Sequence, residues 1–215
     1  MSARLANDLL WDEAGAVMLE VAASLFTFFV LIFGVIEFTY VFFQWNSATM
    51  ATERGARLAA VSDPVATELK TMDGLTATNL PGDPMPDYNC TCDGSTQACT
   101  STAGTTCTYS SDAMKTILYG RPASGVPTSC ISGVNGSMCV FMPTLQESNI
   151  VVKYQNTGMG YAGRQSGPIP TITVSLKNVS YNFLFLNSLL KLTSLSFPAR
   201  ATSTVTGEDL KAAGS

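Results

Sequence analysis

The apolar run from Ala16 to Phe43 constrains this chain more than any other feature. Between Val21 and Ile36 it contains no charged residue, it has no proline, and Gly34 is its only interior glycine. About 20 mostly apolar residues are enough for a helix to cross a bilayer. Because the run is apolar on every side, its length and its lack of helix breakers decide the interpretation, and they predict a membrane-spanning helix.

Two carboxylates interrupt this run, Glu20 near its start and Glu37 near its end. A carboxylate in lipid is costly, so each is expected to have a partner or to reach water. Glu37 follows about 25 Å further along the helix axis, near the opposite interface, where water or head groups are within reach. A cut between Gly15 and Ala16 would give Glu20 a cation, because the new α-amino group would lie nearby in the same subunit or in a neighbour.

The stretch Gly15-Ala16-Val17-Met18-Leu19-Glu20 resembles the start of type IV prepilins, and most of all the TadE-like minor pilins (pseudopilins) of tight-adherence (Tad, or Flp) pili. Gly34-Val35-Ile36-Glu37-Phe38 also resembles the outer end of their helix. The resemblance implies a leader over 1–15 and cleavage by a prepilin peptidase between Gly15 and Ala16, on the cytoplasmic side. It also implies an assembly role for Glu20 and contacts with other pilins and Tad pilus assembly proteins.

The leader departs from the prepilin pattern, because Asp12 and Glu13 stand where basic residues are usual. An alternative is an ordinary signal anchor, with Glu20 at the membrane interface and Gly15 incidental. A cleavable secretory signal fits less well, since its apolar core is shorter and follows a basic segment.

The helix is expected to continue beyond the membrane segment, over 44–61. Its residues at spacings of three or four form one stripe: Trp45, Ala48, Ala51, Gly55 and Leu58. Asp63-Pro64 is expected to end this helix and to cap the next one, because proline is tolerated at a first helical position. The outer part of the helix can therefore carry a domain.

Residues 62–215 are enough for one modest domain. Short helices are predicted over 65–72 and 111–119, the second with Ser110 or Ser111 as cap and Gly120 as stop. From Met138 onward the pattern indicates strands, with segments at 139–142, 149–154, 169–176 and 197–205. Short connections favour an antiparallel sheet, so the expected fold class is α+β.

The segment 183–195 contains eight large apolar residues, Phe183, Leu184, Phe185, Leu186, Leu189, Leu190, Leu192 and Leu195. It is interpreted as a short helix or hairpin covering the sheet, or as an exposed patch that meets a partner or the membrane surface. The tail from Glu208 onward is predicted to fray.

All six cysteines follow the membrane segment, within 90–139: Cys90, Cys92, Cys99, Cys107, Cys130 and Cys139. An even number in a polar segment indicates disulfides in an oxidising compartment, and six cysteines allow 15 pairings. Cys90 and Cys92 are too close to favour pairing with each other. A zinc site is the alternative, but it would need four thiolates because the chain has no histidine.

Composition excludes several functions. The net charge is −4 without a block of like charge, which disfavours nucleic-acid binding. No histidine, phosphate-binding loop or nucleophile motif supports an enzyme, a cofactor or a metal. Two functions stay open. The first is a TadE-like minor pilin that acts in pilus biogenesis and adhesion. The second is a single-pass, membrane-anchored periplasmic binding domain with no pilus role.

Either function places the chain in the bacterial inner membrane. Its amino terminus would be cytoplasmic and its domain periplasmic, and a pilin would be incorporated into an extracellular pilus.

Overall fold

The computed structural model describes residues 13–121, 125–130, 136–179, 183 and 201–207. They fall into two compact units: the first comprises 13–43 and 183, and the second comprises 44–121, 125–130, 136–179 and 201–207. The leader before residue 13, the apolar segment after Phe183 up to 195, and the tail after 207 lie outside the described residues. The fold class is α+β, as predicted, with one long apolar helix, an antiparallel sheet and three disulfides.

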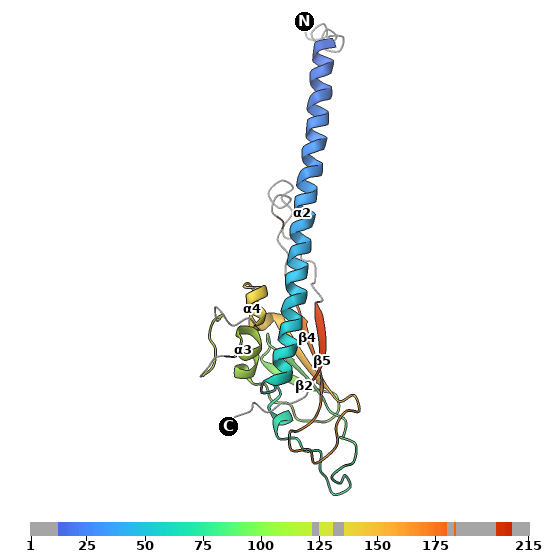
Figure 1. Cartoon of the computed structure of the whole chain (residues 1–215), viewed down its shortest axis with the longest axis vertical. Helices are drawn as coiled ribbons and strands as arrows, with labels where there is room; N and C mark the ends of the chain where they lie inside the picture. The colour runs from blue at the N-terminus through green and yellow to red at the C-terminus, as the bar shows by residue number, and fades with distance from the viewer. Residues whose placement is uncertain (1–12, 122–124, 131–135, 180–182, 184–200, 208–215) are drawn as a thin grey trace. The chain divides into compact units, whose positions relative to one another are not determined.

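Helix α2 spans Glu13–Val61 (Figure 1). Up to Phe43 most of its apolar side chains are exposed, and none of the residues in its most apolar window is buried. It is the one helix in the described part of the chain that is long and apolar enough to cross a membrane. The hydroxyls of Thr27 and Thr39 donate to carbonyls one turn earlier, at 2.9 and 2.8 Å. This segment therefore suits a lipid environment, where an unpaired donor is costly.

Beyond Phe43, helix α2 belongs to the second unit and buries a narrow stripe of small residues. The stripe consists of Ala48, Ala51, Thr52, Gly55, Ala56, Ala59 and Ala60. Its spacing confirms the expected helical face, although Trp45 is half exposed and Leu58 only partly buried. A Cβ on Gly55 would lie 2.5 Å from the sulfur of Met138, so the glycine allows close packing.

The second unit contains a five-stranded antiparallel sheet with the order β2-β1-β3-β4-β5. The strands are β1 (Asn89–Asp93), β2 (Ala98–Ser101), β3 (Ile150–Gln155), β4 (Thr171–Leu176) and β5 (Thr202–Thr206). One face is buried in the same core as the end of α2, through Ile150, Val152 and Tyr154 of β3 and Ile172, Val174 and Leu176 of β4. The predicted strands at 149–154 and 169–176 and their inward faces are confirmed.

The hairpin β1–β2 was not predicted, because its residues carry little apolar material. Cys90 and Cys92 alternate with polar residues and are both buried. A cysteine behaves as a small apolar residue once it is buried. The alternation in Asn-Cys-Thr-Cys-Asp is therefore a strand pattern in which cysteine takes the apolar positions.

The prediction of helix α3 is confirmed at both ends. It spans Ser111–Tyr119, the Ser110 hydroxyl accepts a hydrogen bond from Ala113 N at 3.3 Å, and Gly120 ends the helix with φ of +96°. Serine is a favoured cap because its oxygen satisfies a free N–H of the first turn, and glycine adopts positive φ without strain.

The prediction of a helix over 65–72 was wrong in extent and in type. The helix expected over 65–72 is a single 3₁₀ turn, η1 (Thr67–Lys70), because Val65 N donates to the buried Tyr154 hydroxyl at 3.0 Å and Ala66 is in a β-bridge. The capping role expected for Asp63-Pro64 is absent at η1, and Asp63 instead pairs with Lys70 at 3.1 Å.

The apolar segment 139–142 was expected to begin the strands, but it lies in a helical turn, α4 (Met138–Phe141). A run of four apolar residues is compatible with either structure, and tertiary contacts decide between them. Met138 and Cys139 are buried in the domain core. A second 3₁₀ turn, η2 (Glu147–Asn149), leads directly into β3.

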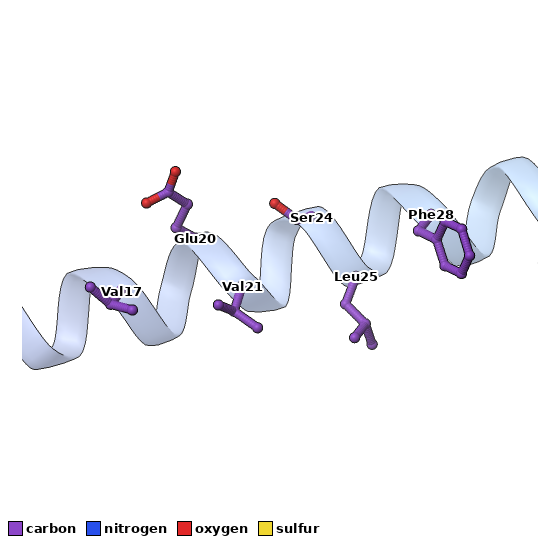
Figure 2. Close-up of a pocket in the computed structure, with 6 residues that line it drawn as sticks. All are labelled: Val17, Glu20, Val21, Ser24, Leu25 and Phe28. Atoms are coloured by element: carbon purple, nitrogen blue, oxygen red, sulfur yellow. The ribbon is translucent and has the colours of Figure 1, made fainter.

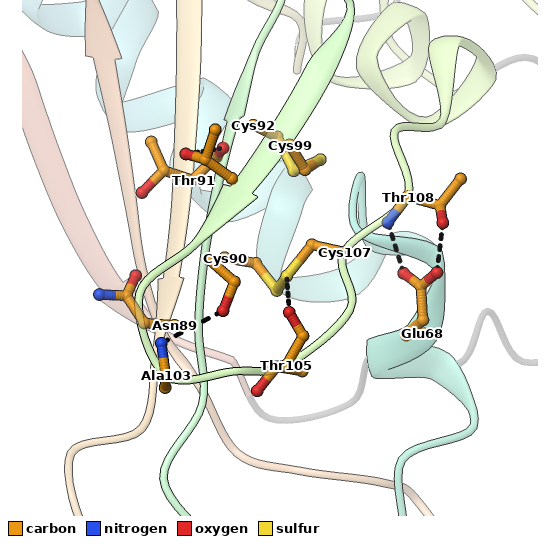
Figure 3. The surroundings of a disulfide bond; sticks show 12 residues. Glu68, Asn89, Cys90, Thr91, Cys92, Cys99, Ala103, Thr105, Cys107 and Thr108 are labelled. Carbon is orange, nitrogen blue, oxygen red and sulfur yellow. Dashed lines mark hydrogen bonds between the residues drawn. A yellow bond between two sulfur atoms is a disulfide. The ribbon is translucent and has the colours of Figure 1, made fainter.

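All six cysteines are joined in disulfides: Cys90–Cys107, Cys92–Cys99 and Cys130–Cys139. The thiolates that a zinc site would need are therefore consumed. Cys92 and Cys99 lie directly opposite each other in the β1–β2 pair. Cys90 ties the same strand to the chain that leads into α3 (Figure 3).

The carboxylate of Glu68 holds the chain next to this disulfide (Figure 3). Thr108 N–H donates to one carboxylate oxygen at 2.7 Å, and the Thr108 hydroxyl donates to the other. Partial burial alone would raise the pKa of Glu68, but the hydrogen bonds from Thr108 outweigh it and lower that pKa. The segment around Cys107 is thus fixed by a covalent bond on one side and by a carboxylate on the other.

We expect removal of Cys90–Cys107 to destabilise the domain more than removal of Cys92–Cys99. The first closes a loop with a separation of 17 residues and the second a loop with a separation of 7. Because a disulfide lowers the entropy of the unfolded chain, the first is expected to add about 3 kcal/mol to the free energy of unfolding and the second about 2.5 kcal/mol. The register of the β1–β2 hairpin also holds Cys92 near Cys99 without the bond.

Denaturant unfolding of the paired Cys→Ser variants, in detergent, measures this difference. Thiol titration of the unfolded, unreduced protein should find close to no free thiol in the parent chain. If the variant without Cys92–Cys99 is less stable than the variant without Cys90–Cys107, the predicted ranking of the two disulfides is wrong.

Candidate assembly site on the amino-terminal helix

The expected cleavage site lies in the first turn of helix α2. The helix begins at Glu13, three residues before the expected start at Ala16, and Gly15 and Ala16 are both exposed. The N–H groups of a first turn have no partners within the helix, so this turn opens more easily than the interior. The bond between Gly15 and Ala16 thus lies between two exposed residues in the first turn of the helix.

Glu20 lies one turn after Ala16 and is exposed. A shallow hollow runs along the same part of the helix, lined by Val17, Glu20, Val21, Ser24, Leu25 and Phe28. Figure 2 shows the carboxylate and the Ser24 hydroxyl on one side of the helix, with Val21 and Leu25 on the other. The face that carries Glu20 is therefore polar at two successive turns and apolar around them.

The apolar part of helix α2 contains no cation that could balance Glu20. Residues 13–43 contain no lysine, arginine or histidine. An ionised carboxylate at the helix centre costs about 2.5–3.5 kcal/mol on insertion scales, and less near the end of the helix. Within residues 13–43, therefore, Glu20 has no basic side chain as a charge partner.

Glu37 differs from the expectation that it reaches water. Its side chain is 3% exposed, whereas the neighbouring Phe38 is 74% exposed. Glu37 also interacts with another group of the chain. The two carboxylates of the apolar run thus have different surroundings, one open to a partner and one enclosed by the chain itself.

Among the residues that sequence reasoning singled out, Gly15, Ala16 and Glu20 lie together within the first two turns of α2, and the cysteines lie in the sheet domain. Sequence reasoning did not single out Ser24. Its position one turn after Glu20 could have been found from helical spacing alone.

Comparison with known proteins supports the family resemblance. Residues 15–57 match the sequence model of the TadE-like protein family. The match begins at Gly15 and covers most of helix α2. Comparison of the whole chain with curated proteins and with solved structures gave no significant match. The TadE-like family is structural rather than enzymatic. Along residues 15–57 of its amino-terminal helix, the chain is similar to TadE-like proteins, a family associated with Tad pili.

Proposed function

We propose that this protein is a minor pilin of a Tad pilus, cut by a prepilin peptidase between Gly15 and Ala16. The observation that carries the proposal is the exposed Glu20, one turn after the expected new amino terminus, on a helix segment without any basic residue. Removal of the leader would create the missing cation. The family match over 15–57 supports the same interpretation.

Glu20 would pair with the Ala16 amine of a neighbouring pilin during assembly. In an isolated subunit the carboxylate lies near lipid, and in an assembly it gains a charge-assisted hydrogen bond. The exposed apolar side chains of α2 up to Phe43 would then contact other helices instead of lipid. Assembly is thus favoured at the position where the isolated helix is least compatible with the membrane.

The proposed location is the bacterial inner membrane, with the amino terminus in the cytoplasm and the sheet domain in the periplasm, before incorporation into an extracellular pilus. The disulfides support an oxidising compartment for the domain. The partners are the prepilin peptidase, other pilins and the Tad assembly proteins, and a contribution to adhesion follows from a place in the pilus.

We expect the mature protein to begin at Ala16 in cells that contain the matching peptidase. Intact mass measurement of the membrane fraction would show the loss of residues 1–15. Replacing Gly15 by leucine should block this loss, because a bulky side chain would enter the peptidase site in place of the glycine.

Gly34→Leu is the matched control, since Gly34 lies in the same apolar helix and a Cβ there would meet nothing within 4 Å. Cleavage should be normal in this variant. An intact leader in the parent chain, with the peptidase active on its other substrates, would favour the membrane-anchored binding domain instead.

A further inference from the structure

Neither edge strand of the described sheet carries a charged residue or a proline. Natural proteins place charged residues, proline or bulges on edge strands to prevent pairing with other chains. Here β2 (Ala98–Ser101) and β5 (Thr202–Thr206) contain no charged residue and no proline. The charged residues of the sheet are in interior strands, Asp93 in β1 and Lys153 in β3. Charged residues, which usually lie on the edge strands, are therefore found only on interior strands of this sheet.

The backbone groups of β5 that point away from the sheet follow from its hydrogen bonds to β4. Leu176 N donates to Ala201 O at 3.0 Å, and Gly207 N donates to Pro170 O at 2.8 Å. Odd-numbered residues of β5 thus face β4. The N–H and C=O groups of Thr202, Thr204 and Thr206 point outward, where β5 has no neighbouring strand among the described residues.

The same reasoning gives the outward groups of β2. Gly94 N donates to Ile150 O at 3.0 Å, so even-numbered residues of β1 face β3. Odd-numbered residues of β1 face β2, where Thr91 pairs with Thr100. The outward groups of β2 are therefore those of Cys99 and Ser101.

The face of the sheet opposite the core carries a row of residues that runs from one edge to the other. Successive neighbours across the strands are Thr100, Thr91, Lys153, Thr173 and Thr204. Thr173 and Thr204 are hydrogen-bonded through their hydroxyls at 3.2 Å. The row thus begins and ends with threonine at the two uncharged edges, and cross-strand threonine pairs are favourable.

We propose that the β5 edge of one copy pairs with the β2 edge of the next copy, so that the sheets of neighbouring subunits join. Antiparallel neighbours alternate along the sheet, so β5 and β2 run in the same direction and the new pair is parallel. With Thr204 beside Thr100 of the neighbouring copy, Thr204 N–H donates to Cys99 C=O of that copy. The Ser101 N–H of that copy donates to Thr204 C=O.

Membrane anchoring selects this head-to-tail pairing over a symmetric one. Figure 1 shows β4 and β5 alongside the end of α2. In an antiparallel pair of two β5 strands, one subunit is turned over relative to the other. Gln44, where the apolar segment joins the sheet domain, would then lie at opposite ends of the pair in the two subunits. A parallel β5–β2 contact keeps Gln44 of both subunits on the same side of the pair, as anchoring of two subunits in one membrane requires.

The paired edges are short, so the contact is weak between free molecules and depends on confinement in a membrane. The inference rests on the membrane anchoring under Proposed function and does not require leader removal. A chain that is cut at Gly15 but does not pair through its edges would therefore contradict the edge pairing alone.

Cysteine cross-linking of the full chain in membranes tests the pairing, because all six native cysteines are already in disulfides. Mild oxidation of a Thr100→Cys/Thr204→Cys double variant should give a ladder of dimers and higher oligomers, linked between residues 100 and 204 by mass spectrometry. Each single variant should stay monomeric. In a Thr100→Cys/Thr173→Cys control, the second thiol lies in the same row but on an interior strand, and no ladder should form.

A charge on the edge should weaken the contact. Thr202→Lys in the double-cysteine background should reduce the ladder at least several-fold, whereas Thr202→Val should keep it. A dimer from Thr204→Cys alone would show symmetric β5 pairing. A cross-link to a different protein would show that the edge pairs with a strand of that protein. Thiols that react with a small reagent but form no ladder of oligomers would show that the edges stay unpaired. Each of these three results would overturn the proposal.

Discussion

Replacing Glu20 by alanine is expected to abolish the contribution of this protein to Tad pili while leaving it inserted and cleaved. The carboxylate is exposed on a helix segment without basic residues, and the proposed function pairs it with the amine of a neighbouring pilin. Without it, the isolated subunit is more stable in lipid and the assembled state loses its charge-assisted hydrogen bond. Pilus counts on the cell surface, protein level and leader removal in the native host would be scored together.

Ser24→Ala is the matched control for this substitution, because Ser24 lines the same hollow one turn later. It should leave pili unchanged. Glu37→Ala is not a suitable control, because Glu37 is buried and its loss would disturb the protein itself. Normal pili with Glu20→Ala would show that Glu20 is an ordinary interfacial residue.

Replacing Gly94 by alanine is expected to destabilise the sheet domain by about 3 kcal/mol or more, at the upper end of the cost of overpacking. Gly94 follows β1, and its N–H donates to Ile150 O at 3.0 Å. A Cβ at this position would lie 1.9 Å from the backbone oxygen of Glu147. Backbone cannot rotate away as a side chain can, so η2 or the β1–β2 hairpin would have to move.

Denaturant unfolding in detergent, followed by tryptophan fluorescence, would measure this change. Gly136→Ala provides the control, since a Cβ there meets nothing within 4 Å and φ is not positive. Its effect should stay within about 0.5 kcal/mol, as for other surface substitutions. Equal stability of the two variants would show that the contact between Gly94 and Glu147 is not tight.

The sequence by itself was sufficient for the long helix, helix α3 and the strands β3 and β4. In each case a local rule is strong: a long apolar run without proline, a serine cap with a glycine stop, and period-two alternation of β-branched residues. The start of the candidate site could also be read locally, because Gly15, Ala16 and Glu20 are neighbours on one helix. The family match lies on the same helix.

Only the tertiary structure decided which cysteines pair, where β1 and β2 lie, and that 138–141 is helical. These features depend on contacts between residues far apart in the chain, which local propensity does not contain. Cys90 and Cys92 form a strand face because β3 lies beside them, and Glu37 is buried although its sequence neighbours are exposed. A local pattern states which residues can be buried, whereas the surface that covers them comes from elsewhere in the chain.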